Sequence, residues 1–145
     1  MQIPEYISKE EVRRVCKALG LSDWTQLSEP KVSLEEARKV QAEVGGEAAE
    51  ISPEEFRQGL EVELEHGLQF PDANVTNNHP ILTGKIVLAH LKEMLDYYTR
   101  LEVAELEGDL LKASLKGDAE KLSRVYRKLL AARASLSQKE FEQSQ

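Results

Sequence analysis

The sequence predicts an all-α protein, a compact helical bundle of about five helices. Apolar residues recur at helical spacing along most of the chain, and no stretch shows the strict alternation that is typical of a half-buried strand. A helix-start signal, serine followed three residues later by glutamate, also occurs at Ser8, Ser33 and Ser52. Repeated start signals without strand patterns favour helices throughout.

Composition limits the class of protein. The chain has 145 residues, of which 41% are hydrophobic, so we expect a single domain over 1–145 with a real core. A net charge of −7 without a dense basic patch argues against nucleic acid as a partner. No apolar run is long enough for a membrane span and no signal-peptide pattern is present, so we expect a cytoplasmic protein. Cys16, the single cysteine, lies among apolar residues and is expected to be a buried, inert thiol.

The first three helices are predicted from their ends. The first runs over 8–20, from the Ser8 cap to Gly20, which can adopt a left-handed conformation. The second ends at Gly45-Gly46, and the third covers 53–69 with Pro53 at the favoured first position. Trp24, in the link between the first two helices, is expected to pack into the core.

The second half of the chain is predicted as a loop and two further helices. Residues 70–79 are rich in Asn, Asp and Pro and predict a loop. The longest helix is predicted over 80–107, capped by Asn78 or His79, with Gly108-Asp109 either ending it or lying within it. A last helix is expected over 118–136, after a break at Lys116-Gly117-Asp118.

The third helix places an acid–histidine pair toward its apolar side. On a helical wheel Glu63 falls near the centre of the apolar arc, with His66 at its edge. A buried carboxylate costs several kcal/mol unless it is paired, protonated or bound to a cation. Glu63 and His66 are therefore candidate site residues.

The long helix repeats the arrangement. His90 falls at the centre of its apolar side, Glu93 at the border, and Tyr97 one heptad beyond His90, so the three are expected to project together. Asp96 and Arg100 are expected to form a surface pair four residues apart.

These residues predict a metal site with Glu63, His66, His90 and Glu93 as ligands and Tyr97 in its surroundings. Imidazole and carboxylate ligands suit iron, manganese or zinc, and two ligand-bearing helices suffice for one ion per chain. The alternative is a buried polar network of the same residues that fixes the helix register. His79 is expected to be a helix cap, or else to reach the site from the 70–79 loop.

Five sequence words stand out in order: Glu61-Val-Glu-Leu-Glu-His-Gly67, Asn74-Val-Thr-Asn77, Leu82-Thr-Gly-Lys-Ile86, Ala89-His-Leu-Lys-Glu93 and Asp96-Tyr-Tyr-Thr-Arg-Leu101. With these words the chain resembles a family of small bacterial and phage proteins classed as a domain of unknown function. The resemblance covers about residues 32–107 and leaves out the first and last helices. The family has Phe-Pro where this chain has Met94-Leu95, which predicts a straighter helix here. The resemblance implies no activity.

Two functions follow as expectations. The first is a small metal-binding protein, and the second is a non-enzymatic helical module for interaction or oligomerisation. In either case we expect a homodimer formed through apolar surface left over on the long or the C-terminal helix. The sequence identifies no reaction.

Overall fold

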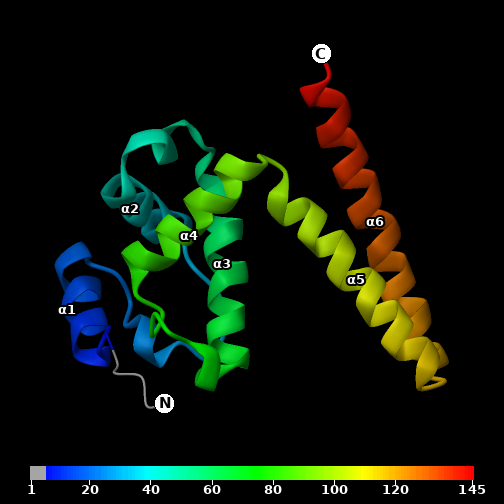
Figure 1. The fold of residues 1–145 in the computed structure, drawn as a ribbon, viewed down its shortest axis with the longest axis horizontal. Helices are drawn as coiled ribbons and strands as arrows, with labels where there is room; N and C mark the ends of the chain where they lie inside the picture. The colour runs from blue at the N-terminus through cyan, green and yellow to red at the C-terminus, as the bar shows by residue number, and fades with distance from the viewer. Residues whose placement is uncertain (1–5) are drawn as a thin grey trace. The chain divides into compact units, whose positions relative to one another are not determined.

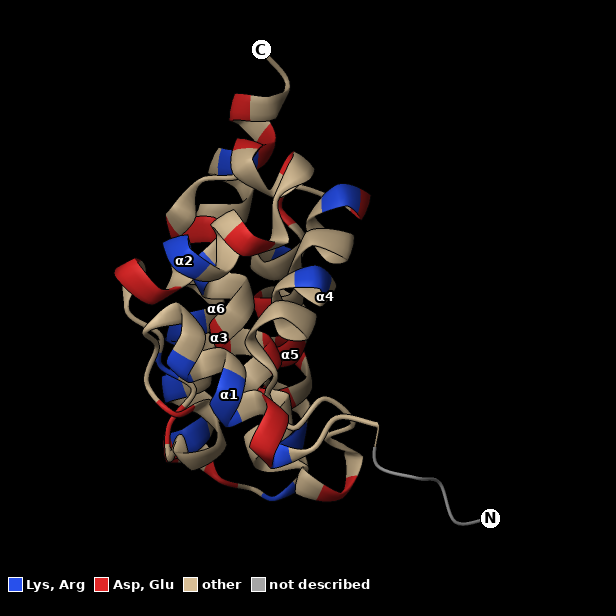
Figure 2. Cartoon of the chain, turned by 90° about the vertical axis from the view of Figure 1, so that its left-hand side faces the viewer, with Lys and Arg blue, Asp and Glu red and all other residues tan. Residues whose placement is uncertain are grey.

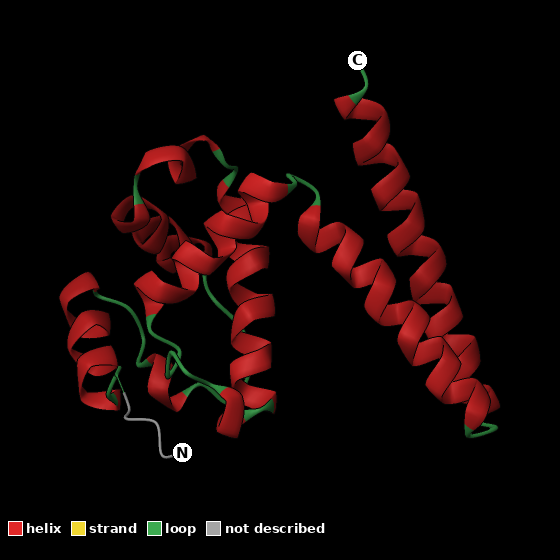
Figure 3. Ribbon diagram, in the orientation of Figure 1, coloured by secondary structure: helices red, strands yellow, loops and turns green. Residues whose placement is uncertain are grey.

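The computed structural model describes residues 6–145, and the regular elements within this range are all helical (Figures 1 and 3). The all-α prediction is confirmed. The described part of the chain has six α-helices rather than about five, because the long helix predicted over 80–107 is divided in two. The α-helices are α1 Lys9–Leu19, α2 Leu34–Val44, α3 Pro53–Gln69, α4 Pro80–Glu93, α5 Tyr97–Leu115 and α6 Ala119–Gln143, and the short 3-10 helices are η1 Trp24–Gln26, η2 Gly46–Glu50 and η3 Pro71–Ala73.

The predicted helix caps are present. The hydroxyls of Ser8, Ser33 and Ser52 accept hydrogen bonds from backbone N–H groups in the first turns of α1, α2 and α3. Gly20 ends α1 with φ of 62°, a left-handed conformation that costs glycine little. The first three helices therefore begin and end within a residue of where their local signals place them.

The structure falls into two compact units, Met1–Lys92 and Glu93–Gln145. The first unit holds α1 to α4 and most of the buried apolar side chains. Trp24 is fully buried there, as predicted, and Cys16 is buried as well. Burial also raises the pKa of the Cys16 thiol, which fits an inert side chain. Other fully buried side chains of this core are Val12, Val40, Phe56, Leu60, Leu64 and Val87.

Gly84 allows α4 to pack closely on its neighbours. A Cβ atom added there would lie 2.8 Å from Val44 Cγ2, 2.9 Å from Val40 Cγ1 and 3.3 Å from Phe56 Cζ. These distances are too short for an alanine without movement of α2 or α3. The glycine therefore sets how deeply α4 sits in the first unit.

The 70–79 loop is tied into the first unit by asparagine side chains. Asn77 Nδ2 donates to the carbonyl of Ile7 at 2.6 Å, and Asn78 Nδ2 donates to the carbonyl of Trp24 at 3.5 Å. Both asparagines have positive φ, 48° and 61°, which asparagine tolerates better than most residues. A loop predicted from turn-forming residues is thus a structural connector between distant segments.

The prediction of one straight helix over 80–107 is wrong. α4 ends at Glu93 and α5 begins at Tyr97, with a turn closed by a hydrogen bond from the Tyr97 N–H to the Met94 carbonyl at 3.0 Å. Neither glycine nor proline causes the break. Asp96 occupies the position before α5 without a capping hydrogen bond from its side chain, and its negative charge lies near the positive end of the helix dipole.

The second unit is an antiparallel helical hairpin of α5 and α6, which lie side by side (Figure 1). α5 continues through Gly108-Asp109, and α6 extends to Gln143, beyond the predicted end at 136. Buried or half-buried residues on both helices follow alternating three- and four-residue spacing, as in a coiled coil. They are Val103, Leu106, Leu110 and Ala113 on α5 and Leu122, Val125, Leu129, Ala132 and Leu136 on α6.

Acidic and basic residues are spread over the helices (Figure 2). Within residues 6–145, no helix combines the length and the apolar character that crossing a bilayer requires.

Candidate functional site

Glu63 and His90 are brought together by the packing of the first unit. His90 Nδ1 of α4 lies 3.0 Å from Glu63 Oε1 of α3. The Glu63 side chain is 14% exposed and the His90 side chain 30% exposed, so the pair lies at the edge of the core. The sequence placed an acid–histidine pair on each helix, Glu63 with His66 and His90 with Glu93, and grouped all four in one site. The contact in the structure joins an acid of one helix to the histidine of the other.

The contact defines what this pair can do chemically. With a proton on Nδ1, His90 donates to the carboxylate, which fixes the orientation of the ring and leaves Nε2 as its acceptor atom. Carboxylates hold metal-binding and proton-accepting histidines in the same way. The contact also occupies one oxygen and one nitrogen that a shared metal ion would need. The geometry therefore suits a hydrogen bond that links α3 to α4, or a single imidazole whose Nε2 is held in one orientation.

The other two predicted ligands have different surroundings. His66 lies on α3 one turn beyond Glu63 and is exposed, and Glu93 is exposed and belongs to the second unit. Among residues 6–145 no group of three or more His, Cys, Asp or Glu side chains is placed to hold a metal ion. Of the four residues, the structure thus pairs Glu63 with His90.

Tyr97 does not continue the face of His90. The prediction assumed an unbroken helix, but Tyr97 is the first residue of α5 and lies beyond the break. It packs edge-on against Tyr98, with ring centroids 5.2 Å apart. The projection of His90, Glu93 and Tyr97 from successive turns of one helix is therefore wrong.

His79 caps α4, as predicted. Its Nδ1 accepts hydrogen bonds from the backbone N–H groups of Ile81 at 3.2 Å and Leu82 at 3.4 Å. The side chain is buried, and burial is the main cause that lowers the pKa of His79 below its ordinary 6.5. A neutral ring is required, because a protonated Nδ1 cannot accept a hydrogen bond.

Asp96 and Arg100 form the predicted pair, but not on the surface. Two hydrogen bonds join the guanidinium to the carboxylate, at 2.9 Å and 2.7 Å, and Asp96 is only 1% exposed. Arg100 also lies 2.8 Å from Glu140 near the end of α6. The guanidinium thus joins the start of α5 to α6, a role that requires contacts outside its own helix.

A second ion pair fixes the hairpin nearer its turn. Arg133 of α6 contacts Glu107 of α5 at 2.6 Å, and both side chains are about half exposed. Glu107 lies seven residues after Arg100, and Arg133 lies seven residues before Glu140. Residues seven apart lie two turns apart on the same side of a helix, so the two ion pairs lie on one side of the hairpin. Both fit the same antiparallel alignment of α5 and α6.

Towards its turn the hairpin also carries four exposed large apolar residues, which we name the hairpin patch: Leu111, Leu115, Tyr126 and Leu130. Leu111 lies one turn beyond Glu107, while Leu130 and Tyr126 lie one and two turns before Arg133. Because the helices are antiparallel, all three residues lie between the Glu107–Arg133 pair and the turn of the hairpin. Leu111 is 61% exposed, Leu115 79%, and Tyr126 and Leu130 48% each.

The sequence predicted leftover apolar surface on the long or the C-terminal helix, but it did not identify these residues. Tyr126 and Arg133 share the helical spacing of α6 with its buried residues, so the pattern alone did not separate the buried row from the exposed one. Heptad spacing does separate them. The row Leu122, Val125, Leu129, Ala132 and Leu136 forms the seam and leaves Tyr126 and Leu130 outside it.

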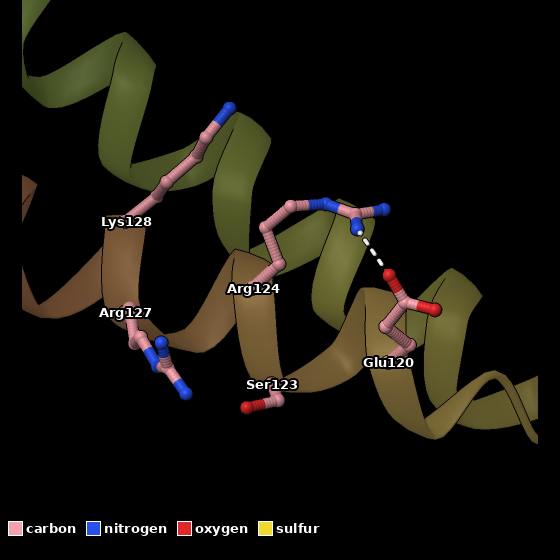
Figure 4. Close-up of a pocket in the computed structure, with 5 residues that line it drawn as sticks. All are labelled: Glu120, Ser123, Arg124, Arg127 and Lys128. Atoms are coloured by element: carbon pink, nitrogen blue, oxygen red, sulfur yellow. Dashed lines mark hydrogen bonds and ion pairs between the residues drawn. The ribbon is translucent and has the colours of Figure 1, made fainter.

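The two helices of the hairpin differ in charge. Residues 102–109 of α5 contain four acidic residues and no basic one, whereas residues 121–133 of α6 contain five basic residues and no acidic one. An open hollow on α6 is lined by Glu120, Ser123, Arg124, Arg127 and Lys128. In Figure 4 Arg124 turns to Glu120, while Arg127 and Lys128 point away from each other. These cations do not converge on one point, so the hollow is a charged surface rather than a small-molecule site.

In comparisons with known proteins, the chain matches a family model but no individual protein. No curated protein and no solved structure matches the chain. A family model described as "Protein of unknown function (DUF5661)" matches residues 12–107, from within α1 into α5. The match begins earlier than the resemblance over 32–107 implied, so the first helix, from Val12 onward, falls within it. The matched segment is most of the chain, and the protein belongs to the DUF5661 family.

Proposed function

We propose that this protein is a non-enzymatic interaction module that binds another protein through its α5–α6 hairpin. The hairpin patch carries the proposal. Its four large apolar side chains are exposed on the part of the hairpin nearest its turn. An exposed apolar surface beside charged residues is typical of an interaction site. Because these side chains are 48–79% exposed, they contribute little to the protein's own core.

The Glu63–His90 pair has a structural role in this proposal. It joins α3 to α4 at the edge of the core, where an unpaired carboxylate would be costly. Together with the capping hydrogen bonds of His79, it holds the first unit in one arrangement.

Site-specific photo-cross-linking tests the proposal. A benzophenone amino acid at position 126 is expected to give discrete adducts in cells that express the protein, and Leu130→Ser in the same chain is expected to remove them. Phe70 is the matched control position, because this aromatic residue is 50% exposed and lies far from the patch in sequence. Adducts at position 126 no stronger than those at position 70 would refute the proposal.

Metal binding is the second candidate function. It is favoured by one observation, the carboxylate of Glu63 held against a ring nitrogen of His90. Iron, manganese or zinc at one ion per chain, lost in His90→Ala and retained in His79→Asn, would support it. Purified protein without metal, and with a melting temperature unchanged by chelator, would exclude it.

A further inference from the structure

We infer that the partner of the hairpin patch is a second copy of this chain, and that two hairpins associate into a four-helix bundle. This inference rests on the proposed function and specifies its partner. It starts from the exposed side chains Leu111, Leu115, Tyr126 and Leu130 and from the charges beside them.

The rim of the patch is complementary to itself. Glu107 on α5 and Arg133 on α6 lie together beside the patch, each about half exposed, so each retains surface for a further ionic contact. Placed face to face about a two-fold axis parallel to the helices, α5 of one copy lies over α6 of the other. Glu107 then meets Arg133 of the second copy, and Arg133 meets its Glu107.

The same axis also agrees with the position of the apolar surface. In this arrangement all adjacent helices remain antiparallel. Both hairpin turns lie at the same end, so the two patches meet each other. Apolar surface in the centre with opposite charges at the rim is the usual arrangement of a protein interface.

Other occupants fit less well. An acidic protein would be attracted to Arg133 of α6 but repelled by Glu107 of α5, because these two residues beside the patch carry opposite charge. A basic partner would meet the reverse problem. A partner matches both helices only if it places a positive charge opposite Glu107 and a negative charge opposite Arg133. A second hairpin related by the two-fold axis does so.

Sedimentation of the full-length chain tests the inference. The wild-type protein is expected to sediment at twice the 16.4 kDa mass of the chain. Leu111→Ser and Leu130→Ser are each expected to raise the dissociation constant at least about tenfold. Val75→Ser is the matched control, because Val75 is 85% exposed in the 70–79 loop, and it is expected to change nothing.

Charge reversal distinguishes contacts between copies from contacts within one. Glu107→Arg and Arg133→Glu are each expected to weaken the dimer, since every rim contact then joins like charges. An equimolar mixture of the two variants restores opposite charges only between chains, so it is expected to recover the dimer as a heterodimer. Circular dichroism of each variant verifies that the helices persist.

Three results would overturn the inference: a wild-type monomer at high micromolar concentration, a dimer indifferent to both serine variants, or no heterodimer in the mixture. A monomer that still cross-links at position 126 to a different protein would remove the second copy and leave the proposed function standing. A monomer without such adducts would refute both the dimer and the proposed function.

Discussion

At the scale of single residues, the structure assigns bonding roles to side chains that looked like metal ligands. Glu63 and His90 satisfy each other across two helices, and His79 uses its ring nitrogen to begin α4. In each case a polar group near apolar surroundings has a partner that removes most of the cost of its burial.

Replacing Glu63 tests the link between α3 and α4. Glu63→Gln retains an oxygen acceptor for His90 and is expected to lower the free energy of unfolding by less than about 1 kcal/mol. Glu63→Leu removes the acceptor and is expected to cost more than Glu63→Gln. A double-mutant cycle with His90→Leu in urea denaturation should give a coupling free energy of about 1 kcal/mol. A coupling near zero would contradict a structural role for the contact.

The cap formed by His79 predicts a pH dependence. Its pKa is lowered in the folded protein, so the unfolded chain takes up the proton first as the pH falls through 6.5. The contribution of His79 to stability is therefore fully present above that pH and is lost as the pH falls below it. His79→Asn retains a side-chain acceptor that does not titrate. The melting temperatures of wild type and variant, measured from pH 8 to pH 5, should diverge at the acidic end, whereas parallel curves would contradict the assignment.

At the scale of elements, the sequence predicted the helix ends that are determined by contacts within a few residues. The ends of α1, α2 and α3 follow from caps within three residues of each helix start, so Ser8, Ser33 and Ser52 were sufficient. The break between α4 and α5 lacks such a signal. Asp96 is held by Arg100, which also contacts Glu140, and a contact 40 residues away cannot be found from local spacing.

Two helical glycines predict opposite responses to the same substitution. Gly84→Ala in α4 would collide with Val40 and Val44 and is expected to destabilise the protein by about 1–3 kcal/mol. Gly108→Ala in α5 meets no atom within 4 Å and is expected to stabilise its helix by about 0.5–1 kcal/mol. Thermal unfolding monitored by circular dichroism compares them directly. Stabilisation by both variants would show that α4 does not pack as closely as described.

At the scale of the whole molecule, the pairing of the candidate site residues depended on tertiary structure. The helical wheels indicated that Glu63 and His90 face apolar surroundings, and both do lie at the edge of the core. Which acid meets which histidine depends on how α3 and α4 are placed against each other. The spacing within one helix suggested the partners His66 and Glu93, and it contains no information on that placement.

Association of two copies predicts a regional change in hydrogen exchange. Amides within 111–130 are expected to exchange more slowly at concentrations where the dimer forms than after dilution, because burial of the patch suppresses opening of the hairpin turn. Amides of α3, within 53–69, are expected to be insensitive to concentration. Equal protection of 111–130 at both concentrations would contradict the assembly.

The burial of Trp24 gives the molecule two independent spectroscopic signals. Trp24 is the only tryptophan and lies in the core of the first unit, so its fluorescence reports the integrity of that unit. Three of the four tyrosines, Tyr97, Tyr98 and Tyr126, belong to the hairpin, whose state their absorbance reports. A single urea titration followed by both signals therefore measures whether the first unit and the hairpin unfold as one cooperative system or as two.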